Sequence, residues 1–541
     1  MALALLLAPA LSDAARARRS LERPPGIPAD VALEASDARI GRIEFRIGDV
    51  FDASDPRESG GLYALANELH IDTRASAIQA QLLFREGDPY SRRVLDESER
   101  VLRNLRYLFD ADIRPIRYYD NTVDVEVATR DVWTLNPGLS FKRRGGENAS
   151  RYELEDTNVL GRGKRISVAR TSNVDRNSWI LQWDDPNVWS SRWRVGLDYA
   201  ENSDGRQRAV LIEHPFFALD SRRALGAHVA DFDRIESRYV LGEIADQFRH
   251  EERSAEVFGG LSSGFRNGWV RRVLAGYRFE ESTFGLPDTG TAPASLPPDR
   301  TVSFPWIGVE WVQDDFKETS NLNQIGRTED LAFGLSARLE AGWSAESLGA
   351  TRDAAIVRGT LSDGFHLTAN QYVFVAGELA SRVEHADPAN LIASGRASYY
   401  LRTGGHGVLF ASAELIGTDA LDPENQVLLG GSNGLRGYPL RYQTGSGLAL
   451  VTLEQRLYTD WYPFRLVRVG GAVFFDAGRT WGRGALDAPN LGWLADVGVG
   501  LRLGMSRSGL GNVLHVDVAL PLNGDDSIDS VQLQVETKRS F

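Results

Sequence analysis

The stretch GLALVTLEQRLY, residues 447–458, decides the fold class of this chain. In an extended conformation Val451 and Leu453 fall on one face, and Glu454 and Arg456 fall on the other, because successive side chains of a strand point to opposite sides. A run of about ten residues with one apolar and one charged face is typical of a transmembrane β-strand, which contacts lipid on one side and a polar lumen on the other.

Four further runs near the C-terminus repeat this alternation: RVGGAVFFDAG (468–478), LADVGVGLRLG (494–504), NVLHVDVAL (512–520) and VQLQVETKRSF (531–541). Strands of soluble sandwiches alternate too, but they average ~5 to 6 residues. The longer runs therefore favour a membrane barrel. Because lipid cannot hydrogen-bond an open sheet edge, we expect the strands to close into a ring.

Composition excludes several function classes. The chain has no Cys, so neither a disulfide framework nor a thiolate metal site is expected. Its 61 basic residues are scattered among 74 acidic ones and the formal charge is −13, which argues against a nucleic-acid partner. None of the eight His falls into a ligand pair, and no motif for a cofactor is found. We expect no metal and no cofactor.

The N-terminus divides into a leader and a linker. MALALLLAPALSDA, residues 1–14, has an apolar run followed by small residues, as in a signal peptide, although no Lys or Arg precedes the run. A disordered tail is the alternative. Residues 15–36 are interpreted as a linker. The sequence has no uncharged apolar stretch of the ~18 residues that a transmembrane helix requires.

Residues 37–131 predict a small α+β domain. RIEFRIGDVF and TVDVEVATRD alternate as strands do, and SRRVLDESERVLRNLRYLF, residues 91–109, carries apolar residues at helix spacing. A strand, two helices and two strands in this order resemble a POTRA domain, the periplasmic module that precedes outer-membrane assembly barrels. The boundary falls near Trp133, after which helical periodicity disappears.

Residues 132–541 are assigned to the barrel. About twenty candidate runs occur in this part of the chain, and we expect a barrel of sixteen strands, an even number. Five strands after residue 446 place the preceding loop on the external side, but the number of runs before that loop is even where the topology requires an odd one. At least one run must be split or wrongly assigned. The Pro- and Gly-rich residues 281–300 predict another external loop.

The loop LLGGSNGLRGYPLRY, residues 428–442, crowds glycines around a single cation, Arg436. GGSNGLRGY resembles the loop motif of the BamA/TamA superfamily of outer-membrane assembly and translocation barrels, also called bacterial surface antigens. In that superfamily an Arg-Gly-aromatic tip, here Arg436, Gly437 and Tyr438, folds back into the lumen. FFDAG, from Phe474 to Gly478, resembles the family's F-x-D-x-G strand.

Two more segments extend this resemblance. LEDTNVLGRG, residues 154–163, is similar to an early barrel hairpin of the superfamily, and the terminal Phe541 resembles the outer-membrane insertion signal. The combined likeness covers about residues 37–541.

The chemistry of the loop follows from its residue types. Asp476 and Glu454 fall on the polar faces of two consecutive strands, and a guanidinium can grip a carboxylate with two donors. We therefore expect Arg436 to pair with one of them inside the lumen. Glycines let the backbone turn and approach the wall closely; those of the loop are Gly430, Gly431, Gly434 and Gly437. The alternative is a solvated external loop with a surface Arg.

Three apparent motifs carry no predicted chemistry. GLSSG, residues 260–264, matches a nucleophile elbow, but strand-like sequence follows it where that motif needs a helix. GRGK, residues 161–164, lacks the spacing of a phosphate loop and is interpreted as a hairpin turn. DDPN, residues 184–187, has two acids among turn residues. We expect no enzymatic activity.

The resemblance implies a function in inserting or translocating client proteins at a bacterial outer membrane. The N-terminal domain would lie in the periplasm and receive unfolded clients, and the seam between the first and last barrel strands would open toward lipid. Pro137 and Gly138 weaken the first strand, WTLNPGLSFKRR. Expected partners are outer-membrane lipid, clients and accessory subunits. A passive channel and a barrel-housed enzyme are the alternatives.

Overall fold

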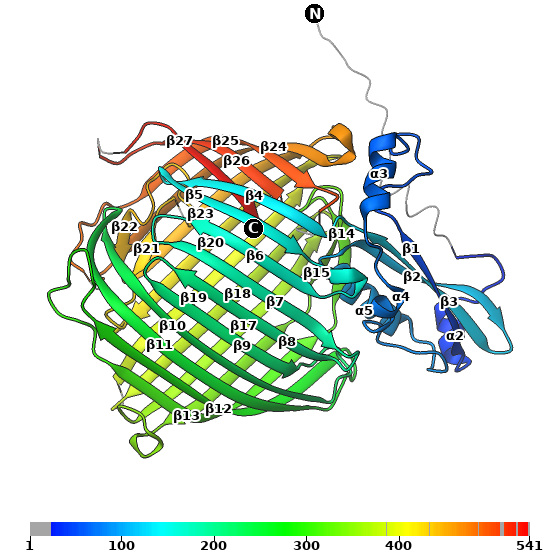
Figure 1. Ribbon diagram of the computed structural model, residues 1–541, viewed down its shortest axis with the longest axis horizontal. Helices are drawn as coiled ribbons and strands as arrows, with labels where there is room; N and C mark the ends of the chain where they lie inside the picture. The colour runs from blue at the N-terminus through cyan, green and yellow to red at the C-terminus, as the bar shows by residue number, and fades with distance from the viewer. Residues whose placement is uncertain are drawn as a thin grey trace, which may run out of the picture.

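The computed structural model describes residues 23–385, 387–431, 433–484, 486–508, 513–525 and 528–538. The predicted signal peptide and Phe541 lie outside these ranges. Within them the chain forms an α+β region and a large β-barrel, with the α+β region standing at one end of the barrel (Figure 1). No helix in the described part of the chain is both long and apolar enough to cross a membrane.

The α+β region is built on a three-stranded sheet in the order β1-β3-β2. Strand β1 (Arg39–Gly48) pairs parallel with β3 (Thr122–Asp131), and β2 (Leu108–Tyr119) pairs antiparallel with β3. The helices are α2 (Asp30–Ala35), α3 (Gly61–Leu69), α4 (Ala75–Gln79) and α5 (Arg92–Arg103). The small α+β domain expected from the sequence is present, but three helices, not two, connect β1 to β2.

The core of this domain follows from the predicted periodicities. The sheet buries Ile40, Val125 and Val127, and α5 buries Leu95 and Leu102 against it. Burial of such side chains stabilises the fold by about 1.5–3 kcal/mol each.

The barrel is a closed antiparallel sheet of twenty strands among the described residues. In chain order the strands are β4 (Leu135–Arg144), β5 (Glu147–Asp156), β6 (Arg165–Ser172), β7 (Asn177–Val188), β8 (Trp193–Asn202), β9 (Gly205–His214), β10 (Arg223–Val240), β11 (Glu243–Ser262), β12 (Trp269–Gly285), β13 (Arg300–Gln313), β16 (Ser336–Ser344), β17 (Ala354–Thr368), β18 (Gln371–Glu384), β19 (Asp387–Arg402), β20 (Gly407–Asp419), β23 (Gly447–Tyr458), β24 (Val467–Trp481), β25 (Leu494–Met505), β26 (Val513–Pro521) and β27 (Gln532–Lys538).

The expectation of sixteen strands is wrong. Fifteen strands, β4 to β13 and β16 to β20, precede the loop that carries Arg436, and five follow it, which gives twenty. The number before the loop is odd, as the topology requires. The number of alternating runs in the sequence, about twenty, is therefore closer to the strand number than the expected sixteen. Residues 286–299, inside the predicted external loop, connect β12 to β13 at the same end as the Arg436 loop.

Two hairpins lie outside the barrel sheet. Strands β14 (Phe316–Ser320) and β15 (Thr328–Ala332) form one of them, in the connection between β13 and β16 at the end near the α+β region. Strands β21 (Val427–Leu429) and β22 (Gln443–Gly445) form the other, at the opposite end. We call these two ends the domain end and the far end. Short 3₁₀ turns occur at η1 (Val159–Gly161), η2 (Glu346–Leu348) and η3 (Pro463–Arg465).

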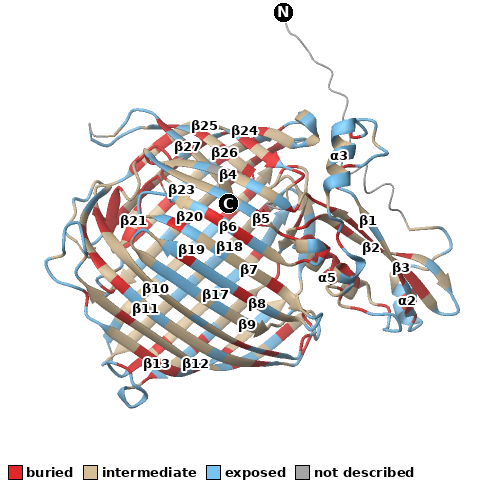
Figure 2. Cartoon of the chain, viewed as in Figure 1, coloured by how far each residue is buried: buried red, intermediate tan, exposed pale blue. Residues whose placement is uncertain are grey.

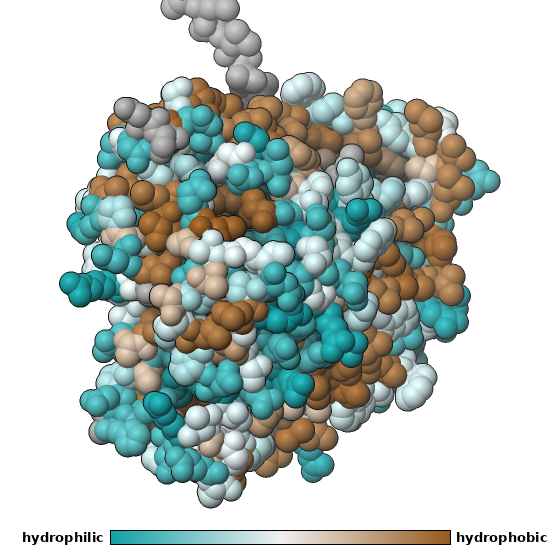
Figure 3. All heavy atoms as spheres, turned by 60° about the vertical axis from the view of Figure 1, so that its left-hand side comes forward, coloured by the Kyte–Doolittle hydropathy of each residue, from teal (hydrophilic) through white to brown (hydrophobic). Residues whose placement is uncertain are grey.

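The wall has the alternation expected from the sequence. In β23 the outward side chains Val451 and Leu453 are exposed, whereas Glu454 and Arg456 are buried on the lumen side. Figure 2 shows buried and exposed residues interspersed along the barrel strands. Figure 3, with the far end turned toward the viewer, shows apolar side chains gathered in patches on the outer surface. Outward apolar side chains on a closed sheet are the architecture of a membrane-spanning β-barrel.

Candidate functional site

The loop between β20 and β23 folds into the barrel and buries Arg436 at 5% exposure. Its Nε and Nη2 donate to the two oxygens of Asp476 at 2.7 and 3.1 Å. Its Nη1 donates to Glu454 at 2.9 Å and to Asp517 at 3.2 Å. The structure thus brings together Arg436, Asp476 and Glu454, and adds Asp517 of β26.

Two further arginines complete a buried ion cluster. Arg456 donates to Glu454 at 2.9 Å, and Arg502 donates to Glu454 at 3.0 Å and to Asp517 at 2.5 Å. Each of these charges is almost fully buried, and buried charges persist only when they are paired. We define the ion cluster as Arg436, Glu454, Arg456, Asp476, Arg502 and Asp517.

The sequence analysis placed Arg456 on a charged strand face, but it assigned no role to Arg456, Arg502 or Asp517. Each occupies a polar-face position in a run with clear alternation, so the alternation alone could have nominated them. Their partners could not be chosen, because the choice depends on the register between strands that are distant in sequence.

The FFDAG segment of β24 receives the loop. The guanidinium of Arg436 lies 3.3 Å from the centre of the Phe474 ring, a cation–π contact that adds to its bonds with Asp476. At Gly478 a Cβ atom would lie 3.0 Å from Leu429 of the loop. The segment therefore gives the loop three contacts: the carboxylate of Asp476, the ring of Phe474, and the open space above Gly478 that Leu429 occupies.

Close backbone approach explains two of the loop glycines. A Cβ on Gly431 would lie 2.4 Å from the Tyr438 carbonyl oxygen and 2.7 Å from the Gly145 nitrogen, so no other residue fits. A Cβ on Gly437 would lie 2.7 Å from the Cβ of Asp496, whose carboxylate accepts a hydrogen bond from the Gly437 N–H at 3.0 Å. Gly430 and Gly434 lie in the same tight loop.

The rest of the loop tip is anchored by apolar and hydroxyl contacts. Tyr438 is buried, and its hydroxyl lies 2.8 Å from two backbone carbonyl oxygens that can accept its hydrogen, those of Ala495 and Asn523. It packs in an apolar cluster at the far end of the barrel. This cluster consists of Val427, Leu429, Leu435, Tyr438, Tyr442, Leu448, Leu450 and Leu494.

The sheet closes at a weak seam between β27 and β4. Among the described residues one residue pair, Val535 with Arg143, joins these strands, whereas β26 and β27 share seven. An ion pair between Arg144 and Glu536 adds a side-chain link. Pro137 and Gly138 lie in β4 and pair with β5 on its other side.

The loop also spans this seam from the lumen side. Gln534 of β27 donates to the Gly431 carbonyl at 3.3 Å, and the backbone near Gly431 lies against the β4–β5 turn at Gly145. Farther along, Arg441 makes two bonds to Asp175, in the β6–β7 connection, at 2.8 and 2.7 Å. The loop therefore contacts the wall on both sides of the seam.

A second insertion obstructs the lumen at the domain end. Leu322, in the β14–β15 turn, is fully buried, and its carbonyl accepts from Arg456 at 2.8 Å and from Tyr458 at 3.0 Å. On the other side Arg103 of α5 grips Asp330 with bonds of 2.8 and 2.6 Å. The hairpin thus connects the α+β domain to the ion cluster.

The segment LEDTNVLGRG forms the turn that seats the α+β domain on the barrel. Asn158 donates to the Thr73 hydroxyl at 2.8 Å, and the Arg74 N–H donates to the Gly161 carbonyl at 2.9 Å. GRGK lies in this same β5–β6 turn, as expected.

Other polar groups have structural explanations. His70 and Asp131 are 3.0 Å apart, and the Thr73 N–H donates to the same Asp131 oxygen at 2.8 Å, so we assign this pair to the domain junction. Asp72 lies close to them, a grouping that sequence spacing did not suggest. Asp185 pairs with Lys164 at 2.7 Å. GLSSG ends β11 and is followed by β12, without the helix that a nucleophile elbow needs.

Comparison with known proteins gives similarities of limited extent. No protein-family model matches the chain. A Treponema pallidum (strain Nichols) protein named "Putative outer membrane protein assembly factor" is 29% identical over 136 residues, 24% of this chain and 16% of its own length. The match therefore spans about a sixth of that relative.

Solved structures with a similar arrangement include BamA from Haemophilus ducreyi lacking POTRA domains 1–3 (TM-score 0.38, 12% identity, 93% of this chain, 84% of that chain). CdiB from Escherichia coli is another (TM-score 0.48, 13% identity, 92% of this chain, 76% of that chain).

Proposed function

We propose that this protein inserts or translocates client proteins at a bacterial outer membrane. The α+β domain lies in the periplasm and receives clients, and the barrel releases them through the seam between β27 and β4. The observation that carries the proposal is the single described residue pair across this seam. Each lost ladder bond lowers the free energy needed to separate two strands, so the wall opens most easily there.

The two insertions into the lumen favour a lateral route over a passive channel. At the far end the loop carrying Arg436 occupies the interior, and at the domain end the β14–β15 hairpin does so. Both insertions are held by buried contacts. A client that crossed through the lumen would have to break both sets of contacts, whereas a client strand added at the seam would disturb only the loop's contacts with β27 and the β4–β5 turn.

Client capture is best explained by strand addition to the edge of the small sheet. The edge of β2 is covered, because Glu99 of α5 accepts from the Ile113 N–H at 2.8 Å and Arg103 donates to the Ala111 carbonyl at 3.0 Å. The first half of β1 is occupied as well, since Ile40 exchanges backbone bonds with Gly87 and Asp88. We therefore assign capture to the second half of β1, residues 44–48.

The name of the Treponema relative, an assembly factor of the outer membrane, supports the same function. Accessory subunits that bring clients to the periplasmic domain are part of the proposal.

The proposal is tested by depleting the protein in its native host and measuring which outer-membrane proteins disappear. A defined set of lost barrel proteins supports it, and unchanged outer-membrane protein content contradicts it. In parallel, purified protein in phospholipid vesicles should accelerate the folding of an unfolded barrel client. Vesicles that instead gain conductance, with no effect on client folding, would support the passive channel.

A further inference from the structure

The side of helix α3 that points away from its own domain exposes three leucines. Its inner side is fixed by Asn67, which bonds the Phe51 backbone at 3.0 and 2.8 Å, and by Tyr63, whose ring centre lies 4.8 Å from that of Phe51. Its outer side carries Leu62, Leu65 and Leu69, which are 82%, 50% and 65% exposed. Their spacing of three and four residues puts them on one helix face. This face has no partner among the described residues.

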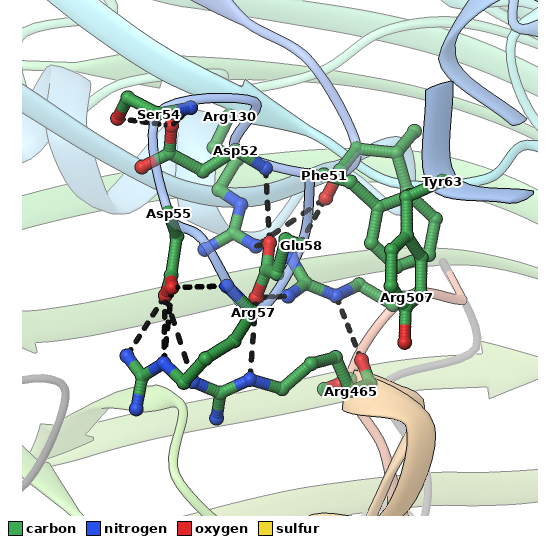
Figure 4. A network of polar contacts seen from close by, with 12 residues as sticks. Phe51, Asp52, Ser54, Asp55, Arg57, Glu58, Tyr63, Arg130, Arg465 and Arg507 are labelled. Atoms are coloured by element: carbon green, nitrogen blue, oxygen red, sulfur yellow. Dashed lines mark hydrogen bonds and ion pairs between the residues drawn. The ribbon is translucent and has the colours of Figure 1, made fainter. Parts of the chain in front are cut away.

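An ion-pair network holds α3 at the rim of the barrel (Figure 4). Glu58, just before α3, pairs with Arg507 in the β25–β26 connection, and Arg507 also donates to the Val50 carbonyl at 2.7 Å. Arg465, in the β23–β24 turn, lies 3.5 Å from Asp55. The helix itself contacts this turn, because the Tyr63 hydroxyl donates to the Phe464 carbonyl at 3.2 Å.

A groove of about 570 Å³ lies between α3 and the rim, and it is lined mainly by apolar side chains. It includes Phe51, Leu62, Tyr63, Trp133, Phe464 and Leu466. Next to it, the turn exposes Trp461 and Phe464, the latter at 79%. Trp and other aromatic residues are enriched where a membrane protein meets the headgroup region.

The apolar surface continues from the groove onto the barrel wall. Leu457 at the end of β23 and Met505 at the end of β25 point outward and are exposed, and Leu501, four residues before Met505 on the same face of β25, is also exposed. In Figure 1 α3 stands beside the turn that joins β23 to β24. The leucine face, the turn and the lipid-facing wall are therefore neighbours, and each of them exposes apolar side chains.

We propose that the outer face of α3 and the β23–β24 turn form a docking surface for the acyl chains of phospholipids in the leaflet nearest the α+β domain. A short helix with one apolar face at a membrane boundary buries that face in the lipid interface. Continuity with the lipid-facing wall selects lipid over a protein partner. This inference requires a barrel in a membrane, but it does not require client insertion, and it places the domain close to the C-terminal strands beside the seam.

The test uses the absence of native Cys. Leu65→Cys is labelled with an environment-sensitive fluorophore, and the full chain is reconstituted in phosphatidylcholine–phosphatidylglycerol vesicles that contain lipids with a nitroxide on the acyl chain. Ala64→Cys is the matched control, because Ala64 is also exposed but lies on another side of the helix. We expect quenching at position 65 to exceed that at position 64 at least threefold. Equal quenching at both positions, or none at 65, overturns the proposal.

A second variant separates lipid from protein occupants. Leu69→Cys should be quenched in the same way at one protein per several thousand lipids and without any client present. An apolar shift of the fluorophore emission without quenching, present only at high protein density, would assign the face to a second copy of the chain. The same shift without quenching, present only after client is added to a face that lipid does not quench, would assign it to a client segment. Either result overturns the lipid assignment while leaving the proposed insertion function untouched.

Discussion

Arg456 donates to Glu454 at 2.9 Å and to the Leu322 carbonyl at 2.8 Å, so the bridge between Arg456 and Glu454 joins the two insertions that fill the lumen. Glu454 also accepts from Arg436 of the far-end loop, and Leu322 belongs to the hairpin that α5 holds. An unbroken series of polar contacts therefore connects the α+β domain to the far-end loop, so a movement of the domain can displace the loop.

This series of polar contacts predicts that Arg456→Met loosens both insertions together. The change leaves Glu454 with two of its three arginine partners and removes the bond to Leu322. Breaking a buried ion pair costs about 3–5 kcal/mol, and we expect the lower part of that range because two partners remain. Limited proteolysis should cut residues 314–335 and 420–446 faster, while strand content stays normal. Faster cutting in one segment alone would show that the insertions are independent.

Arg436→Ala is predicted to release the far-end loop more completely. It removes both bonds to Asp476 and strips a partner from two other buried carboxylates, so a loss of about 3–5 kcal/mol is expected in urea unfolding from vesicles. Arg441→Ala is the control, because its pair with Asp175 is partly exposed and exposed pairs contribute about 0–1 kcal/mol.

The pairing itself is isolated by a double-mutant cycle with Asp476→Ala. Because the two side chains share two hydrogen bonds, the combined loss should fall short of the sum of the single losses by about 0.5–3 kcal/mol. Additive losses would show that the loop is not held through this pair. Client insertion should decline in parallel with loop release if the loop also steadies the seam.

The polar face of each wall strand and the position of the Arg436 loop could be predicted from the sequence, but the number of strands could not. The alternation of Glu454 and Asp476 with apolar neighbours reflects the strand pleat, which is local, so their lumen side could be predicted. Whether an alternating run joins the wall depends on its distant partner. The β14–β15 hairpin stays outside the wall, because its partners are Arg103 of α5 and the lumen residues Arg456 and Tyr458, which no local pattern specifies.

The same limit applies to α3. Its helical spacing is local, but its position at the barrel rim depends on Glu58 meeting Arg507, 449 residues away. The ion cluster likewise unites three arginines and three carboxylates from five separate segments.

The α+β domain should become less stable as pH rises from about 4.5 to 7. Burial raises the pKa of Glu99 from 4.5 to about 7, and this effect exceeds the opposing influence of Arg92 and Arg103. Because the folded state then holds a proton that the unfolded state has lost, stability falls as pH rises through this window. Each pKa unit corresponds to about 1.4 kcal/mol, so the upper limit of this effect on the free energy of unfolding is about 3.5 kcal/mol.

Calorimetry of the full chain checks this effect on the transition of the α+β domain. Glu99→Gln cannot titrate, so its melting temperature should change less between pH 5 and 8 than that of the unaltered chain. Glu44→Gln on β1 is a matched control, because the side chain of this glutamate is 41% exposed, whereas that of Glu99 is buried. Identical pH profiles for Glu99→Gln and the unaltered chain would rule out Glu99 as the source.

A disulfide across the seam should stop client insertion without unfolding the barrel. Arg143 and Val535 face each other in the described register, and Arg143→Cys with Val535→Cys would supply the only thiols in the chain. Oxidation should reduce the rate of client folding in vesicles at least tenfold, and a reductant should restore it.

The control is Val499→Cys with Val518→Cys, a facing pair in β25 and β26. This bond lies away from the seam, so oxidation there should leave the rate unchanged. Full activity of the oxidised seam variant would exclude lateral opening, and equal inhibition in the control would show that rigidity of the wall, not closure of the seam, blocks insertion.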